Sequence, residues 1–468
     1  MTDTTDMSGP PGGARASFGT LIPHRSTGLK LLLVCGLALL MAIPALFVYG
    51  VVYERSNGAQ QALNEVAAKV GGEQTVLGPV LAIPYSYAPD ADKPAEIVYG
   101  IGLVYPETGR VDAHVAVEER QRGIHLVPVY TTDADFIAVF DPANFSAAWP
   151  RGATPVWSDA RFYMGLRDAR GLKTAILATA NAAPLVFEPA AYGSGSNSYS
   201  PVPSSDLKLA SAELPGLKDL EGALTLRAEM SFSGAGRIAF APFARDTDVA
   251  MTSDWASPSF TGGILPRDHN VGASEDGFTA NWRVPYLARG IPGAGPNLSL
   301  YDLTAYGRND LAVKFIREAN PYQSVQRALK YGAMFIGLVF LTYFLFEVTS
   351  QLRAHPAQYI LVGLAQTIFY LLLLALSEKV SFDMAFLIAA GMTVCLISAY
   401  AKSVFQSWLY GGRALIVLSG IYGLIYMLMR AEDNALIAGA FASFTAIAFT
   451  MWMTRNVDWY GDRQPGTA

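Results

Sequence analysis

Six uninterrupted apolar runs divide this chain, one near the N-terminus and five in the last third. The first, Leu31–Tyr53, is 23 residues long and contains no charge. A helix of that length covers about 34 Å, more than the ~30 Å hydrocarbon core of a bilayer. The pattern therefore predicts six membrane-spanning helices, the other five being Tyr331–Phe346, Tyr359–Leu376, Phe382–Tyr400, Ala414–Met429 and Ala435–Met453.

The first run could also be a cleaved signal peptide, whose apolar core is ~7–15 residues and ends at small side chains. This run is longer and continues through Phe47, Val48 and Tyr49. Cys35 lies too early in it for lipoprotein cleavage. We therefore expect an uncleaved anchor helix, kinked at Pro44, which membrane helices tolerate.

The distribution of lysine and arginine predicts the orientation. With a cytoplasmic N-terminus, the short outside loops carry only Lys379 and Arg430, whereas the inside segments carry Arg15, Arg25, Lys30, Arg353, Lys402, Arg413, Arg455 and Arg463. Both termini are then cytoplasmic. The expected division is a disordered tail 1–30, a span 31–53, an outside domain 54–330, a five-helix bundle 331–453 and a tail 454–468.

An amphipathic helix is expected directly after the first span. Apolar residues recur at helical spacing from Ala59 to Val70, and Gly71-Gly72 would end the helix after about three turns. Its apolar face would pack on the outside domain or on the membrane surface, and the sequence leaves both open.

Beyond Gly72 the apolar period changes to two, which predicts strands. Glu107–Arg110 and Arg120–Gly123 are expected turns, and Gly193–Ser205 a flexible polar loop. The expected strands are Val111–Glu118, Ile124–Val129, Leu224–Met230 and Gly236–Phe240. The predicted fold class is thus a six-helix membrane protein with a large β-rich, sandwich-like domain, in one lobe or two, between spans 1 and 2.

Composition supports a membrane protein and excludes other classes. Of the residues in this chain 51% are hydrophobic and only 16% are charged. In soluble chains about a quarter of the residues are charged. Its net charge is −5 and no basic run reaches five residues, which argues against nucleic-acid binding. Residues 54–330 carry 24 basic and 30 acidic residues, a charge of −6. Two cysteines, Cys35 and Cys395, both in apolar runs, provide no disulfide framework.

Candidate catalytic and metal-binding residues are few, and we expect neither an enzyme, nor a metal, nor a cofactor. No HExxH, GxSxG, Walker A, CxxC or dinucleotide motif occurs. His114 and His125 on neighbouring strands could form a metal pair, Asp268-His269 a dyad in a turn, and Asp133 with Asp135 one acidic strand face. For each, a solvated surface residue is the commoner outcome. The remaining histidines are His24 and His355.

Charges in the C-terminal spans are confined to the span ends, where side chains reach the headgroups. These residues are Glu347, Glu378, Lys379, Asp383 and Arg430. Within the spans the polar residues are groups such as Gln366, Thr367, Ser398, Ser419 and Thr445. The bundle therefore lacks an obvious proton relay, which weakens a transporter hypothesis without removing it.

Four stretches together resemble the CreD family of bacterial inner-membrane proteins. They begin with Tyr53-Glu54-Arg55 and Gln74–Tyr85, followed by Arg122–Tyr130. The third comprises Ser253–Pro266 with Gly277–Trp282, and the fourth Arg327, Lys330, Tyr331, Phe346-Glu347, His355–Tyr359 and Leu371–Glu378. The resemblance implies a non-enzymatic factor, located in the inner membrane, that supports cell-envelope integrity and stress tolerance through a periplasmic domain.

Within these stretches most features suit structural roles. Gly78-Pro79 and Gly262-Gly263 suit tight turns, and the rings of Trp255, Phe260, Phe278 and Trp282 would fill the core. The alternative is an exposed patch for a partner, formed by Trp255, Pro258, Phe260 and Pro266. Its partner would be an envelope protein or lipid, besides the bilayer itself. Two other functions stay open: a transporter or lipid-handling protein that uses the bundle, and a membrane-anchored hydrolase.

Overall fold

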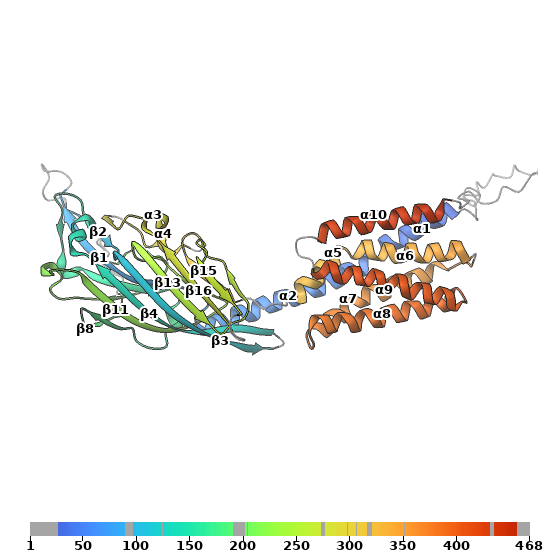
Figure 1. Cartoon of the computed structure of the whole chain (residues 1–468), viewed down its shortest axis with the longest axis horizontal. Coiled ribbons are helices and arrows are strands. Elements are labelled where there is room, and N and C mark those ends of the chain that lie inside the picture. The colour runs from blue at the N-terminus through green and yellow to red at the C-terminus, as the bar shows by residue number, and fades with distance from the viewer. Residues whose placement is uncertain are drawn as a thin grey trace, which may run out of the picture. The chain divides into compact units, whose positions relative to one another are not determined.

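The computed structural model describes residues 27–88, 97–123, 125–190, 202–203, 205–272, 277–296, 298–305, 307–315, 321–350, 352–430 and 435–455. The chain divides into two compact units, which we call the membrane bundle (Met1–Ser56 with Asn320–Ala468) and the β domain (Asn57–Ala319) (Figure 1). The expected polar loop Gly193–Ser205 lies almost wholly outside the described residues, as do most of the two expected tails.

The membrane bundle is helical. Its helices are α1 (Thr27–Leu40), the start of α2 (Ala42–Val70), α5 (Pro321–Lys330), α6 (Gly332–Ser350), α7 (Pro356–Ser377), α8 (Phe382–Val404), α9 (Trp408–Arg430) and α10 (Ala435–Thr454). Five described segments are long and apolar enough to cross a membrane: Gly28–Val70, α6, α7, α8 and α9. The sixth expected span falls on α10, where the described apolar stretch, Gly439–Thr454, is shorter. The expected membrane architecture is confirmed.

The first span contains a local interruption close to its proline. Met41 alone separates α1 from α2, three residues before Pro44. Proline has no N–H to donate to the carbonyl four residues back, here that of Leu40. The helical bonds continue on either side, from Met41 N to the Leu37 oxygen (3.1 Å) and from Ala45 N to the Met41 oxygen (3.3 Å).

Helix α2 continues from the span into the β domain, and its second half is the expected amphipathic helix from Ala59 to Val70. It runs for 29 residues, from Ala42 to Val70, without a break. The linking residues 54–58 (ERSNG) contain no proline and remain helical. The expected end is confirmed: the N–H groups of Gly71 and Gly72 both donate to the Ala67 oxygen, at 3.0 and 2.7 Å.

The last turns of α2 pack on the β domain. Leu63, Val66, Ala67 and Val70 lie against a small buried cluster formed by Val127, Val129 and Ala235. Of the two sites left open for the apolar face, the domain is therefore the correct one. The long helix and the β domain share a hydrophobic contact over about two turns.

The β domain consists of two sheets (Figure 1). The ten-stranded sheet contains β1 (Gln74–Tyr87), β2 (Val98–Val104), β5 (Thr154–Pro155), β6 (Arg161–Leu166), β9 (Glu188–Pro189), β10 (Lys208–Ala212), β12 (Arg237–Phe240), β14 (Pro258–Phe260), β17 (Ala294–Pro296) and β18 (Leu311–Phe315). Its main path is β14-β18-β12-β1-β6-β10-β9, with β2 and β5 also paired to β1 and β17 paired to β2.

The second sheet has eight strands in the order β15-β16-β13-β3-β4-β11-β7-β8. They are β3 (Thr108–Arg122), β4 (His125–Phe140), β7 (Leu177–Ala180), β8 (Ala183–Val186), β11 (Leu224–Ala235), β13 (Asp246–Ser253), β15 (Asp268–Val271) and β16 (Phe278–Val284). Most neighbours are antiparallel, but β1–β12 and β3–β13 are parallel. Among the described residues, the 3-10 turns Pro142–Ala148, Trp157–Asp159, Ala169–Gly171 and Leu217–Asp219 connect strands.

One hydrophobic core joins the two sheets. Phe136 of β4 contacts the ring of Phe240 of β12 (centroids 6.2 Å apart), and Phe140 contacts Phe162 of β6 (5.3 Å). In β11 buried and more exposed positions alternate, as the period of two predicts. The expected β-rich, sandwich-like domain is confirmed, and one large core cluster contains described residues of both sheets.

Three local predictions were wrong. Thr108–Arg122 is one strand. Of the two expected turns, only Glu107, which follows β2, and Gly123, at the β3–β4 hairpin, lie outside it. The charged end of β3 is a solvent-exposed strand. Its polar composition resembles that of a loop, so the sequence pattern did not distinguish the two. Gly78-Pro79 lies inside β1, where a Cβ at Gly78 would meet the Phe243 ring at 2.7 Å. This glycine permits close packing rather than a turn.

Candidate functional site

The expected partner patch lies mostly against the core. Trp255, Pro258, Phe260 and Pro266 are all half-buried. The Trp255 ring packs on Phe315 (6.4 Å between centroids), and its Nε1 donates to the Ser257 oxygen at 3.1 Å. Among the described residues of this segment, Leu265 is the only large apolar side chain that is well exposed, at 66%. A role in partner contact remains a prediction.

The other aromatic residues of this segment are core residues, as expected. Trp282 is 2% exposed and Phe278 3%. The Phe260 ring lies 6.1 Å from Trp282 and 6.0 Å from Phe278, edge to face in both pairs. Trp282 Nε1 donates to the Ile264 oxygen at 3.1 Å, which ties the segment to β16. These rings hold β14 and the following loop onto the sandwich.

The histidine candidates are not brought together. In the β3–β4 hairpin His114 lies opposite Asp133, whereas His125 lies opposite Arg122, eight residues further along β3. That separation is about 27 Å, so the two imidazoles cannot share an ion. His114 Nδ1 is 3.0 Å from the hydroxyl of Thr252. Among the described residues no group of three His, Cys, Asp or Glu could hold a metal ion.

The acidic candidates lie on the surface of the second sheet. Asp133 and Asp135 are exposed on one face of β4, as their spacing predicts. Asp268 and His269 are exposed as well, but they belong to edge strand β15 and not to a turn. The His269 ring lies 5.1 Å from that of Phe260. Pairing of β15 with β16 makes this short segment extended.

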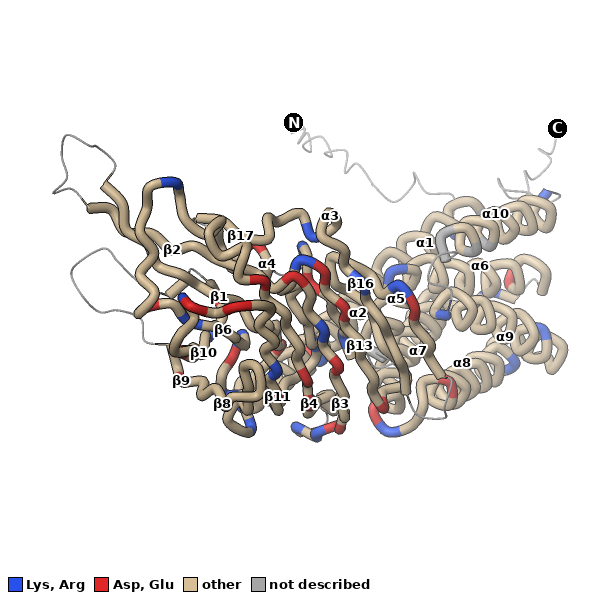
Figure 2. Tube along the Cα trace, turned by 60° about the vertical axis from the view of Figure 1, so that its left-hand side comes forward, with Lys and Arg blue, Asp and Glu red and all other residues tan. Residues whose placement is uncertain are grey.

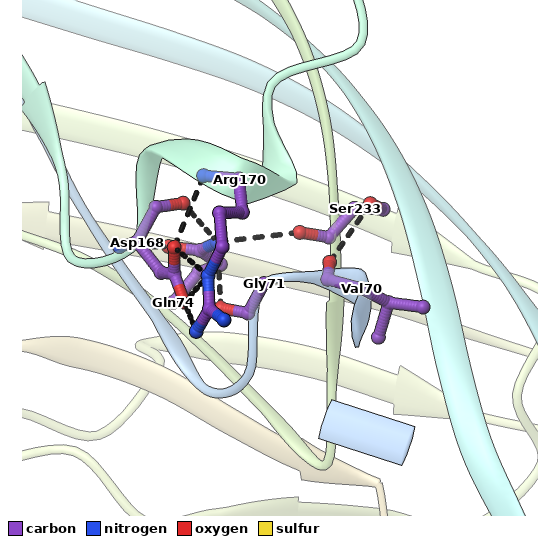
Figure 3. Close-up of polar contacts among 6 residues, drawn as sticks. All are labelled: Val70, Gly71, Gln74, Asp168, Arg170 and Ser233. Atoms are coloured by element: carbon purple, nitrogen blue, oxygen red, sulfur yellow. Dashed lines mark hydrogen bonds and ion pairs between the residues drawn. The ribbon is translucent and has the colours of Figure 1, made fainter. Parts of the chain in front are cut away.

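A buried polar cluster, which we call the clasp, fixes the point where α2 ends and β1 begins (Figure 3). Its centre is Gln74, which is fully buried. The side-chain amide Nε2 donates to the carbonyls of Gly71 (2.9 Å), Asp168 (2.9 Å) and Ser233 (3.3 Å). Its Oε1 accepts from Asp168 N at 3.2 Å. One side chain thus connects the helix end with segments of both sheets.

Two further groups complete the clasp. The hydroxyl of Ser233 donates to the Val70 carbonyl at 2.9 Å, which satisfies a carbonyl in the last turn of α2 (Figure 3). At its solvent side, Arg170 Nε donates to the Asp168 carboxylate at 3.0 Å, and this holds the pKa of that carboxyl below its ordinary value. The helix end is therefore fixed by side-chain hydrogen bonds as well as by apolar contact.

A buried ion pair fixes the loop that follows β14. Arg237 of β12 pairs with Asp310, and both side chains are at most 1% exposed. Asp310 also accepts hydrogen bonds from the backbone N–H groups of Gly263 and Gly307, both at 3.1 Å. A side chain at Gly262 or Gly263 would meet backbone atoms of residues 308–312, so these two bends require glycine. The expected bend at Gly262-Gly263 is thus confirmed.

The membrane bundle contains a second ion pair, between half-buried Lys30 of α1 and buried Glu347 of α6. Glu347 is 7% exposed and also accepts a hydrogen bond from the Tyr359 hydroxyl at 3.1 Å, while Lys30 donates to the Ala354 oxygen at 3.2 Å. The expectation that Glu347 reaches into the headgroups was therefore wrong. Asp383 and Arg430 do form an exposed pair, as residues at span ends should.

The charges of the two units differ in placement. Figure 2 shows Lys, Arg, Asp and Glu spread over the β domain, whereas helices α6 to α9 carry charge only near their ends. The polar groups described so far pair with one another or with backbone, an arrangement that holds segments together. Lys30 connects the anchor span to helix α6 in this way, and Gln74 connects the end of α2 to the β domain.

The fold and these contacts define a class of protein: an integral membrane protein with a two-sheet β domain inserted between its first and second spans. The family model for "Inner membrane protein CreD" matches residues 26–460. Over 439 residues the chain is 30% identical to the inner membrane protein CreD of Escherichia coli (strain K12), covering 92% of this chain and 93% of that protein. The chain belongs to the CreD family and is a multi-pass inner-membrane protein.

Sequence reasoning missed the residues that hold these segments. Gln74 was recognised only as part of a family-like stretch, and Glu347 was expected to face the headgroups. Asp310 and Arg237 were not recognised as candidates. A polar residue next to a long apolar run, as Gln74 is beside Thr75–Tyr85, was the available signal, because such a residue is buried with its strand. The partners in the two ion pairs lie 73 and 317 positions apart and leave no local pattern.

Proposed function

We propose that this protein supports the integrity of the cell envelope under stress, without catalysing a reaction, by presenting its β domain on the periplasmic side of the inner membrane. The observation that carries the proposal is the unbroken helix α2, which leaves the membrane and ends in the clasp. A partner bound to the β domain is then joined to a membrane span through the residues of α2.

The orientation is part of this proposal. Eight basic residues against two favour cytoplasmic termini and a periplasmic β domain. Alkaline phosphatase, which is active only outside the cytoplasm, should be active when fused after Gly102 and inactive when fused after Asp458. The opposite pattern would place the β domain in the cytoplasm and contradict the proposal.

The role in the envelope is tested in a strain that lacks the gene. We expect such cells to be more sensitive to detergent than the parent, and the full-length protein to restore tolerance. Equal tolerance of the deletion strain and the parent in detergent and under other envelope stresses would reject the role. Labelling of the purified protein by serine-hydrolase probes, lost on denaturation, would instead favour a hydrolase.

The importance of the unbroken helix is tested at one position, Gly58. A Cβ there meets only His125 Nε2, at 3.4 Å, so Gly58→Ala should be tolerated. Gly58→Pro breaks the helix, because proline removes a hydrogen bond and clashes with the preceding turn. We expect both proteins to accumulate but only Gly58→Ala to protect the envelope. Full protection by Gly58→Pro would show that continuity of α2 is dispensable.

A further inference from the structure

The β domain contains a second fully buried arginine, Arg289, whose surroundings differ from those of Arg237. It is the last residue of the short helix α3 (Tyr286–Arg289) and is 1% exposed. Its Nε, Nη1 and Nη2 atoms find no hydrogen-bond partner among the described residues, and neither does the hydroxyl of Tyr105. The guanidinium carbon lies 4.0 Å from the centre of the Tyr105 ring.

The comparison with two other arginines shows what is missing. Arg237 has the carboxylate of Asp310. Arg245 also lies over a tyrosine ring, that of Tyr286 at 4.3 Å, but Glu107 pairs with it at 3.1 Å. For Arg289 the described residues supply no carboxylate, only the ring and hydroxyl of Tyr105 beside it. Buried charge is normally paired, and buried polar atoms without partners are rare and call for an explanation.

Arg289 nevertheless carries its charge at neutral pH. Burial lowers the pKa of its guanidinium, though only to about 10, and burial raises the pKa of the Tyr105 hydroxyl to about 12. At pH 7 the first group is thus a cation and the second a neutral hydrogen-bond donor. Both groups can therefore donate a hydrogen bond to a negatively charged oxygen.

A hollow of about 430 Å³ borders Arg289. This volume is in the range of small-molecule sites. Arg308 and Asn309 add donors to its wall, Ile291 and Leu298 add apolar surface, and Asp302 adds one carboxylate. Asp302 is already engaged with Arg308, at 3.9 Å. Helix α4 (Tyr301–Thr304) lies beside α3 at the same edge of the β domain (Figures 1 and 2).

We propose that this hollow binds a small molecule through an oxyanion, a carboxylate or a phosphate group, with Arg289 as the buried counter-charge. Arginine presents a fork of donors that matches both groups. The oxyanion contacts Arg289 at the base of the hollow, and Arg308 and Asn309 contact it from the mouth. Because the guanidinium nitrogens are covered, the wall has to shift outward on binding. The site is independent of the proposed role in the envelope.

The test uses the full-length protein in detergent and measures its thermal unfolding midpoint. Potassium phosphate and potassium succinate are titrated separately, with potassium chloride keeping the ionic strength constant. We expect a saturable rise with at least one of the two anions, of about 5–10 °C at a concentration ~100 times the Kd. The anion that acts shows whether the group bound is a phosphate or a carboxylate.

Variants decide whether Arg289 is responsible. Arg289→Met should unfold at the same or a higher temperature in chloride, because it removes an unpaired buried charge, and should not respond to the anions. Arg245→Gln, at the paired arginine, should respond as the parent does. Arg308→Gln, at an exposed position, should weaken the response roughly tenfold in concentration if the oxyanion loses one contact worth about 1.4 kcal/mol.

Two results would overturn the proposal. One is an unfolding midpoint of the parent that does not change with phosphate or succinate, which would leave buried water as the partner of Arg289. The other is an equal response in Arg289→Met and the parent, which would place the anion elsewhere. If Arg289→Met fails to accumulate, an unchanged response in Arg308→Gln combined with Asn309→Ala rejects the site in the same way.

Discussion

The β domain and the membrane bundle each contain an ion pair with a buried carboxylate, but the two units satisfy these carboxylates differently. In the β domain Asp310 has Arg237 and two backbone N–H donors from loops. In the bundle Glu347 has Lys30 and a side-chain hydroxyl from Tyr359. Helices consume their own backbone donors, so a buried carboxylate between helices must find its partners on side chains. Loops between strands have backbone donors to spare.

The two units also differ in where their apolar side chains face. In the β domain they alternate inward to one core. In the bundle many face outward: Leu387 is 67% exposed and Ile416 73%. A lipid-facing helix buries this surface in the bilayer, whereas a soluble domain cannot expose it at such density. Truncating a buried group should therefore cost more unfolding free energy in the β domain. There the gap fills with water or the remaining partner is left unpaired.

Breaking the ion pair of the β domain should have the largest effect. Asp310→Ala leaves Arg237 buried without its carboxylate, which costs about 3–5 kcal/mol of unfolding free energy. Denaturant unfolding of the purified protein measures the loss. The double variant Arg237→Met with Asp310→Leu should recover much of it, because both charges are then absent. A double variant no more stable than Asp310→Ala would show that the two backbone hydrogen bonds matter more than the charge.

Removing a core ring should follow closely. Trp282→Ala should cost ~3–5 kcal/mol, as truncation of buried aromatic residues does, and the protein should fall in abundance. Trp255→Ala should cost less, because Trp255 is only half-buried. Immunoblots and detergent sensitivity are measured in the same strains. A Trp255→Ala protein of normal abundance that no longer protects the envelope would support the partner patch; normal abundance of Trp282→Ala would contradict its place in the core.

The clasp should rank third. Gln74→Ala removes donors from the carbonyls of Gly71, Asp168 and Ser233, and an unsatisfied buried carbonyl costs about 1–3 kcal/mol. Hydrogen exchange should become faster in the last turns of α2, since the helix end is released. Gln60→Ala on the exposed side of the same helix is the control and should leave exchange unchanged. Equal exchange in both variants would mean that apolar packing alone fixes the helix.

The ion pair of the bundle should have the smallest effect of the four. Glu347→Gln keeps a partner for Tyr359 and leaves Lys30, which is 29% exposed, able to turn toward water or headgroups. We expect a loss of ~1–2 kcal/mol in detergent unfolding, typical of a polar contact between membrane helices. Asp383→Asn, in the exposed pair with Arg430, should cost less still. A loss of unfolding free energy as large as that of Asp310→Ala would show that the two units depend equally on their ion pairs.

Local patterns in the sequence determined the elements of this protein. Apolar runs gave the positions of α6 to α9, because a helix must be about as long as the bilayer is thick. The period of two gave the strand faces in β3, β4 and β11, and Gly71-Gly72 gave the end of α2. These signals depend on neighbouring residues and on solvent alone. The composition of residues 54–58 did not reveal that α2 continues, because packing on Val127 and Val129 stabilises its second half.

Only the tertiary structure decided which segments meet. The parallel pairs β1–β12 and β3–β13 join strands more than a hundred residues apart in the chain, and no local period encodes such a choice. The same holds for Gln74 with Ser233, Arg237 with Asp310 and Lys30 with Glu347. Whether a polar side chain is solvated or buried depends on the partner that folding places beside it. Glu347 and Glu378 both lie at the end of an apolar run. The fold of the bundle buries Glu347 but leaves Glu378 half-exposed, and the sequence pattern does not distinguish them.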